Sequence, residues 1–166
     1  MLYLRLDFLL SDMVAMHKMS LDSYEDTYAL IALHSSLEDF SLVYTINKYL
    51  KCSFKRRPKN LYFSSTVSFP IFEWKDIVND TYWTLVANTG HTKEDSNSTG
   101  FFKNEPSFSK KHLIPEYKNV DYFIKLEQED LEADQTILKS ILSIPKIITA
   151  YIIDTDKLKS KNNLIF

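Results

Sequence analysis

The chain has 166 residues, of which 45% are hydrophobic and 25% are charged, and its formal net charge is −2. This length fits one domain, and the composition is that of an ordinary globular protein, which excludes disorder over most of the chain. The small net charge gives no global attraction to nucleic acid or to anionic membranes, so such a partner would need a local patch. A single cysteine, Cys52, excludes an intramolecular disulfide and a multi-cysteine zinc site and predicts a reducing, cytoplasmic location.

Residues 1–10 are mostly apolar, but Arg5 and Asp7 interrupt them and no small-residue cleavage site follows, so we expect no secretory signal. The sequence also lacks the run of about 20 apolar residues that a membrane-spanning helix needs, and we expect no membrane partner. The regular hydrophobic pattern starts at Met16. We therefore predict an N-terminal extension over residues 1–15 and a single domain over residues 16–166, with an additional first strand within the extension as the alternative.

The regular pattern opens with apolar runs that predict strands over residues 16–21 and 27–33. Ser35 and Glu38 then have the spacing of a capping box, in which the serine accepts a hydrogen bond from a free backbone amide and the glutamate reaches back. They predict a helix over residues 36–50 that lies on a sheet. Its apolar face is expected to carry the residues that recur every three or four positions, namely Phe40, Val43, Tyr44, Asn47 and Leu50.

The middle of the chain is rich in aromatic and β-branched residues, which predict antiparallel strands over residues 60–63, 66–74 and 81–87. Pro70 cannot donate a ladder hydrogen bond, so the second of these strands should be an edge strand or be interrupted. The polar stretch over residues 88–104 contains both glycines of the chain and predicts a long connection. Because glycine is so scarce, the sequence has no phosphate-binding loop, dinucleotide fingerprint or nucleophile elbow, and we expect no cofactor.

The last third of the chain is the most regular. It predicts a strand over residues 121–127, a helix over residues 133–144 that ends before Pro145, and a strand over residues 146–153. The tail over residues 157–166 is expected either to dock through Leu164, Ile165 and Phe166 or to be free.

These elements predict an α+β fold. We expect a two-layer sandwich, in which a mostly antiparallel sheet of about five to seven strands carries two main helices on one face. A strand-helix-strand unit ends the chain, and a right-handed crossover in it would set strands 121–127 and 146–153 parallel to each other.

The stretch over residues 114–122 reads Ile-Pro-Glu-Tyr-Lys-Asn-Val-Asp-Tyr and resembles the string that names the IPExxxVDY family. All of the named positions are filled, by Ile114, Pro115, Glu116, Val120, Asp121 and Tyr122. Residues 34–40, 69–74 and 159–166 also look like family segments, so the resemblance covers residues 16–166. It implies a bacterial protein of uncharacterised function and supplies no catalytic residues.

Two interpretations of this string remain open. In the structural one, which we favour, it forms a turn in which Pro115 fixes the backbone and Glu116 and Asp121 accept hydrogen bonds from backbone amides. In the chemical one, the two carboxylates perform acid-base or metal chemistry, which requires a cleft and perturbed pKa values.

The histidines give a weaker signal. None of His17, His34, His91 and His112 has metal-ligand spacing, so we expect no metal site. His34, Ser35 and Ser36 lie where a strand end would face a helix N-terminus, a place that can bind anions. The favoured alternative is a histidine bonded to backbone beside an ordinary helix cap.

Six cations lie close together after the first predicted helix: Lys48, Lys51, Lys55, Arg56, Arg57 and Lys59. With Phe54, Tyr62 and Phe63 nearby, they form a candidate nucleic-acid site, in which the cations neutralise phosphates and the aromatic rings stack on bases. The competing interpretation is a solvated helix end that complements the helix dipole. The acidic run over residues 127–134 has the same local role ahead of the second helix.

Three classes of function follow, and none of them has an assigned catalytic residue. We favour a non-enzymatic interaction or accessory protein, whose partner is another protein or a second copy bound through edge strands and exposed aromatic residues. The second is an RNA-associated accessory protein that uses the six cations. The third is an enzyme, which would need His34, Glu116, Asp121 or His112 to converge in one pocket.

Overall fold

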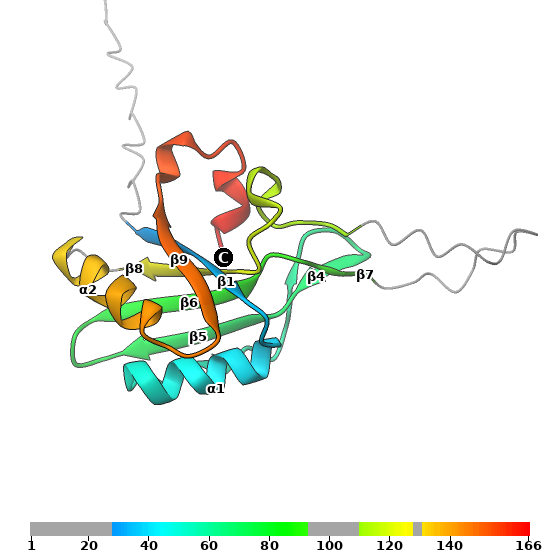
Figure 1. Cartoon of the computed structure of the whole chain (residues 1–166). Coiled ribbons are helices and arrows are strands. Elements are labelled where there is room, and N and C mark those ends of the chain that lie inside the picture. Colours follow the sequence, from blue (N-terminus) through cyan, green and yellow to red (C-terminus); the bar gives the residue numbers. More distant parts are fainter. Residues whose placement is uncertain (1–27, 93–109, 128–130) are drawn as a thin grey trace, which may run out of the picture.

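The computed structural model describes residues 28–92, 110–127 and 131–166, which form two sheets and two α-helices (Figure 1). The larger sheet has the strand order β2-β5-β6-β8-β1-β9 and the smaller one the order β3-β4-β7. In chain order the strands are β1 (Ala29–Ser35), β2 (Lys55–Arg56), β3 (Leu61–Tyr62), β4 (Val67–Phe69), β5 (Ile71–Asp76), β6 (Thr81–Ala87), β7 (His91–Thr92), β8 (Tyr122–Glu127) and β9 (Ile147–Ile153). The α-helices are α1 (Asp39–Leu50) and α2 (Leu131–Leu142), and the 3₁₀ helices are η1 (Pro115–Tyr117), η2 (Thr155–Lys157) and η3 (Lys161–Leu164).

The predicted α+β class is confirmed. Every strand pair of the larger sheet is antiparallel, and β1 lies between β8 and β9 with both neighbours antiparallel to it. The strands β8 and β9 therefore run parallel to each other, as expected for the C-terminal strand-helix-strand unit, but β1 is inserted between them. The pairing brings the first described strand of the chain into contact with the last.

One face of the larger sheet carries both helices, as predicted. Alternation along β1 points Ile31 and Leu33 to this face, where they pack with Leu42 and Ile46 of α1 and with Ile141 of α2. Side chains from β5, β6 and β8 complete the same cluster. We call it the helix-side core.

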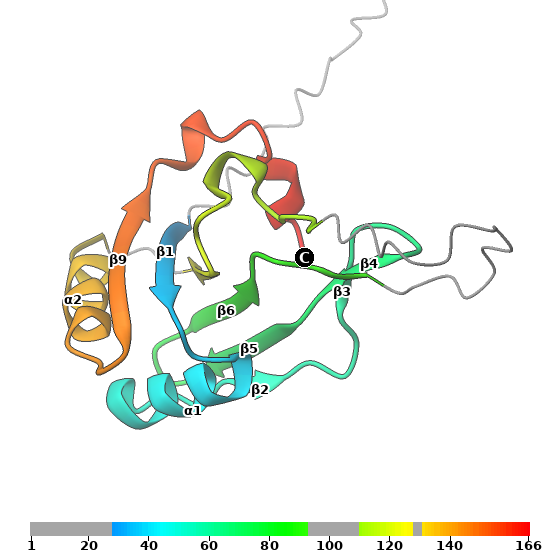
Figure 2. The ribbon, with the colours of Figure 1, turned by 45° about the vertical axis from the view of Figure 1, so that its right-hand side comes forward.

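The opposite face of the sheet is also covered, although no α-helix of the described residues lies on it. Leu30 and Ala32 of β1 point to this side and pack with Ile114 and Val120 from the segment before β8 and with Leu164 of η3. Figure 2 shows this segment, in yellow-green, beside the red C-terminal segment, both far from α1. The tail thus docks through Leu164 and, partly, Phe166, whereas Ile165 is exposed, against the prediction for that side chain.

Pro70 interrupts the predicted strand over residues 66–74, as expected. The chain leaves the smaller sheet at Phe69 and enters the larger sheet at Ile71, so that Pro70 stands between β4 and β5. A residue that lacks an N–H is tolerated here because no ladder bond has to start from it. Its carbonyl oxygen still accepts a hydrogen bond from Ala87.

Two details predicted for the first helix are wrong. Ser35 still belongs to β1, the helix begins at Asp39, and the N-cap residue Glu38 makes no side-chain capping bond, so the capping box is not formed. Of the predicted apolar face, Val43 is buried and Leu50 packs partly against the core, but Phe40 and Tyr44 are exposed, and Leu42 and Ile46 are buried in their place. Apolar residues occur all around this helix, so spacing alone does not determine which side is buried.

Several sequence predictions lie outside the described residues: the extension over residues 1–15, the strand over residues 16–21, His17 and the part of the 88–104 connection after Thr92. Within the described part of the chain, no helix is both long enough and apolar enough to cross a membrane.

Candidate functional site

The string over residues 114–122 joins distant parts of the chain. Ile114 and Val120 are buried in the second core, and Pro115 opens η1. The Glu116 carboxylate accepts two hydrogen bonds from Ser160, one from its backbone amide at 2.8 Å and one from its hydroxyl at 2.7 Å. Glu116 therefore fastens the C-terminal segment to η1.

The end of the same string fastens the turn between β1 and α1. The Asp121 carboxylate accepts a hydrogen bond from the Ser35 amide at 3.0 Å, and the Tyr122 hydroxyl donates to the Leu37 carbonyl at 2.8 Å. Burial, and then the nearby carboxylates of Asp39, Asp121 and Glu38, raise the pKa of Tyr122 to about 12, so its phenol keeps the proton that it donates. Both carboxylates of the string accept from backbone amides, as the structural interpretation predicts.

The Asn88 side chain bonds to the backbone of the string at three points, and the sequence did not lead us to expect this. Its side chain is fully buried, donates to the carbonyls of Tyr117 and Val120 at 2.8 and 2.9 Å, and accepts from the Ile114 amide at 3.0 Å. Its backbone also bonds to Leu113 and Asp121. A signal was present, since this asparagine directly follows an apolar strand, but its partners lie more than twenty residues away.

The residues of the enzyme hypothesis make separate contacts. Glu116 is bonded to Ser160 and Asp121 to Ser35, and the His34 ring lies against Tyr151 with ring centroids 5.9 Å apart. His112 has a buried Nδ1 atom without a hydrogen-bond partner. Among the described residues, no group of three or more histidine, cysteine or acidic side chains could hold a metal ion.

The proposed anion site at the end of β1 is largely occupied by the protein itself. The Ser35 amide donates to Asp121, and the Ser35 hydroxyl donates to the Lys146 carbonyl while accepting from the Leu37 amide. Ser36 is exposed and His34 is partly exposed. Since a carboxylate already takes the Ser35 amide, an anion would have to displace it.

The cationic segment is divided between structural and free groups. The Arg56 guanidinium donates to the carbonyls of Arg57 and Ile71 and to Asn60, and it lies 5.4 Å from the centre of the Phe72 ring. Arg57 forms an ion pair of 3.2 Å with Glu73. The exposed remainder consists of Lys48, Lys51, Lys55 and Lys59.

The aromatic residues near these cations are not equally accessible. Phe54 is buried in the helix-side core and cannot stack on a base, whereas Tyr62 and Phe63 are exposed. A hollow of about 410 Å³ beside β2 instead combines cations with Trp74 and Tyr82; its lining also includes Lys55, Arg56, Arg57, Glu73 and Lys75. The aromatic partners of a cationic site would thus come from β5 and β6.

Cys52 carries a buried thiol just after the C-terminal end of α1. Its Sγ atom lies 3.4 Å from the Asn47 side-chain oxygen, which also accepts from the Phe54 amide. Burial raises the pKa of the thiol to about 11, so it is protonated at neutral pH. A protonated, buried thiol is no nucleophile.

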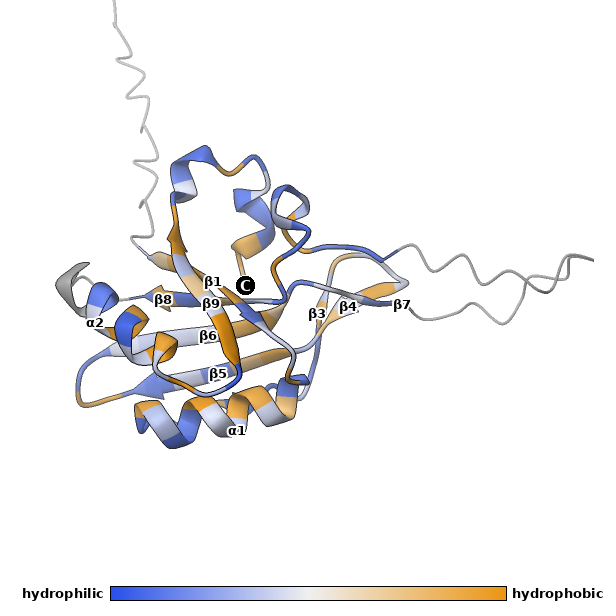
Figure 3. Ribbon diagram, in the orientation of Figure 1, coloured by the Kyte–Doolittle hydropathy of each residue, from blue (hydrophilic) through white to orange (hydrophobic). Residues whose placement is uncertain are grey.

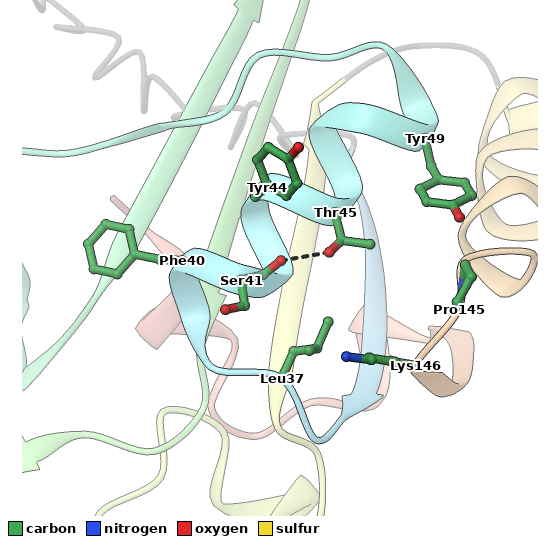
Figure 4. Close-up of a pocket in the computed structure, with 8 residues that line it drawn as sticks. All are labelled: Leu37, Phe40, Ser41, Tyr44, Thr45, Tyr49, Pro145 and Lys146. Atoms are coloured by element: carbon green, nitrogen blue, oxygen red, sulfur yellow. Dashed lines mark hydrogen bonds between the residues drawn. The ribbon is translucent and has the colours of Figure 1, made fainter.

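A partly apolar groove lies along the outer side of α1. It has a volume of about 450 Å³ and is lined by Leu37, Phe40, Ser41, Tyr44, Thr45, Tyr49, Pro145 and Lys146. The side chains of Phe40, Tyr44 and Tyr49 are 66%, 70% and 47% exposed. Figure 4 shows Tyr49 facing Pro145 and Lys146 pointing toward Leu37.

Two contacts hold residues of the groove in place. The Phe40 ring packs edge-on against Phe72 at 5.5 Å, and the Thr45 hydroxyl donates to the Ser41 carbonyl at 2.7 Å (Figure 4). Lys146 makes no ion pair with any described residue. The groove thus offers aromatic rings, several hydroxyl groups and the Lys146 ammonium.

No family model, curated protein or solved structure matches this chain.

Proposed function

We propose that the chain is a non-enzymatic interaction protein that binds a partner protein in the α1 groove. The observation that carries this proposal is that Phe40, Tyr44 and Tyr49 of α1 are exposed, although the same helix is anchored in the core through other side chains. Exposed tyrosine and phenylalanine side chains supply much of the binding energy of protein interfaces, because each buries a large area at a small entropic cost. Three such rings exposed on one helix favour a binding role.

The chemistry of the groove specifies the kind of partner. Its rings and Leu37 favour apolar side chains, and the positive charge of Lys146 favours a carboxylate beside them. An amphipathic segment that carries one acidic residue fits both demands. We further propose a cytoplasmic location and membership of the IPExxxVDY family, in which the string serves to position the β1–α1 turn at the foot of this groove.

The test compares the native partners of tagged wild-type protein with those of the double variant Tyr44→Ala/Tyr49→Ala. Both side chains are exposed, so the variant should fold normally and lose a stoichiometric, nuclease-resistant protein partner. Val78→Ala is the matched control, because Val78 is 91% exposed and lies in the β5–β6 turn outside the groove. A partner that binds the double variant as well as it binds wild type would reject the groove.

A second candidate function, association with RNA, is supported by the hollow beside β2, where Lys55 and Lys75 are exposed near Trp74. Lys55→Glu/Lys75→Glu should weaken binding to single-stranded RNA and reduce its dependence on salt, because fewer counterions are released. Lys139→Glu, on the exposed side of α2, is the control. Binding that is absent, or that does not change with salt, would end this candidate.

A further inference from the structure

The two edges of the larger sheet differ in how they are protected. At one edge, β2 has only two residues, both cationic, and Pro58 follows shortly after. Short length, positive charge and nearby proline are the devices by which proteins keep an edge strand from pairing with another chain. The β2 edge is therefore protected.

The other edge lacks most of these devices. The strand β9 has seven residues with the sequence Ile-Ile-Thr-Ala-Tyr-Ile-Ile, which contains neither a charge nor a proline. Among the described elements it pairs with β1 alone. Figure 3 shows the strand in orange and white, and Ile148 is 72% exposed. A register shift near Ile148 is the one irregularity, and it lies at the start of the strand.

We propose that β9 pairs antiparallel with β9 of a second copy of this chain, around a twofold axis at Ala150. The proposal does not rest on binding in the α1 groove, although Lys146 lines that groove and also flanks β9. Such pairing closes on itself, because both copies use the same strand, and it joins the two sheets into one. It satisfies the outward backbone groups of both edges.

The sequence of β9 is self-complementary in this register. Ala150, the smallest residue of the strand, lies at the axis, Thr149 faces Tyr151 of the second copy, and Ile148 faces Ile152. Pairs of β-branched and aromatic residues are favourable across antiparallel strands. The residues that flank the strand, Lys146 and Asp154, have opposite charges, so its paired ends bring no like charges together.

The first test measures molecular mass against concentration by light scattering or sedimentation. Wild type should be a dimer, and Thr149→Lys should raise its dissociation constant about tenfold or more, because an exposed charge is placed on the pairing edge. Ile165→Lys is the control, since Ile165 is 74% exposed and lies outside β9. Circular dichroism at low concentration checks that each variant is folded.

The second test checks the register. A Thr149→Cys sample mixed with a Tyr151→Cys sample should form a disulfide between chains, because directly opposite residues lie about 5 Å apart. Either sample alone should not, since the diagonal separation of about 7 to 8 Å is too long. Two results overturn the proposal: a monomer at about 1 mM, or a dimer that tolerates Thr149→Lys and gives no mixed disulfide. Neither result affects the α1 groove, which these variants leave unchanged.

Discussion

At the scale of single residues, the Asn88 side chain makes three hydrogen bonds to the backbone of one distant segment. Replacing it with alanine removes two donors and one acceptor from buried backbone groups of Ile114, Tyr117 and Val120. Buried groups left without partners cost about 1 to 3 kcal/mol each before relaxation, so Asn88→Ala should lower the free energy of unfolding by about 3 kcal/mol. Urea denaturation measures this, with the exposed Asn162→Ala as control, and a loss below about 1 kcal/mol would contradict it.

Glu116 gives a prediction about pH. Glu116 is exposed, and the slight desolvation of its carboxylate would alone raise its pKa, but hydrogen bonds, chiefly from Ser160, outweigh this and lower the pKa below its ordinary value. A carboxylate with a lowered folded-state pKa stabilises the fold above its ordinary value of about 4.3, and this contribution is lost as the pH falls through the lowered pKa. The attachment of the C-terminal segment should therefore weaken only in acid.

The measurement is an NMR titration of the Ser160 amide, which donates to Glu116. Its chemical shift should change with a midpoint below about 4.3. The change should disappear in Glu116→Gln, which cannot titrate. A midpoint at or above the ordinary value in wild type would show that the two hydrogen bonds do not favour the charged carboxylate.

These residues mark a limit of sequence reasoning. The two acidic residues of the string accept hydrogen bonds from backbone amides, as the structural interpretation predicts. The partners were not predictable: Ser35 lies 86 residues from Asp121, and Ser160 lies 44 residues from Glu116. Asn88 was overlooked because a polar residue at a strand end normally indicates a solvated turn.

At the scale of elements, α1 shows why aromatic residues misled the prediction. Phe40 and Tyr44 have helical spacing and large apolar surfaces, but the smaller Leu42 and Ile46 are the buried ones. The capping box failed for a related reason, since Ser35 is held in β1 by bonds to Asp121 and Lys146. The strands were predicted better, because alternation and Pro70 are local signals.

The orientation of α1 can be tested by a pair of substitutions. Leu42→Ala removes a fully buried side chain from the helix-side core and should lower the free energy of unfolding by about 3 kcal/mol. Tyr44→Ala changes an exposed position and should alter it by no more than about 0.5 kcal/mol. Chemical denaturation of both variants decides the matter. If the tyrosine variant were the less stable one, the helix would be rotated relative to this structure.

At the scale of the whole molecule, one sheet separates two cores that share its strands. Successive residues of β1 contribute to opposite cores, and so do those of β8, where Tyr122 and Ile124 face the helices while Phe123 faces the C-terminal segment. A loss of packing on one face of the sheet therefore destabilises strands that also contribute side chains to the core on the other face. This coupling predicts one cooperative unfolding transition.

Tryptophan fluorescence provides the test, because both tryptophans report on the helix side. Trp74 and Trp83 pack edge-on with ring centroids 4.8 Å apart, and both contact the helix-side core. Leu164→Ala removes a buried side chain from the other core and should cost about 2 to 3 kcal/mol. If the two faces unfold together, the fluorescence midpoint in urea should fall as far as the circular dichroism midpoint, and Ile165→Ala should leave both unchanged. A fluorescence transition that stays at the wild-type midpoint in Leu164→Ala would show that the C-terminal segment detaches on its own and that the sheet does not couple its two faces.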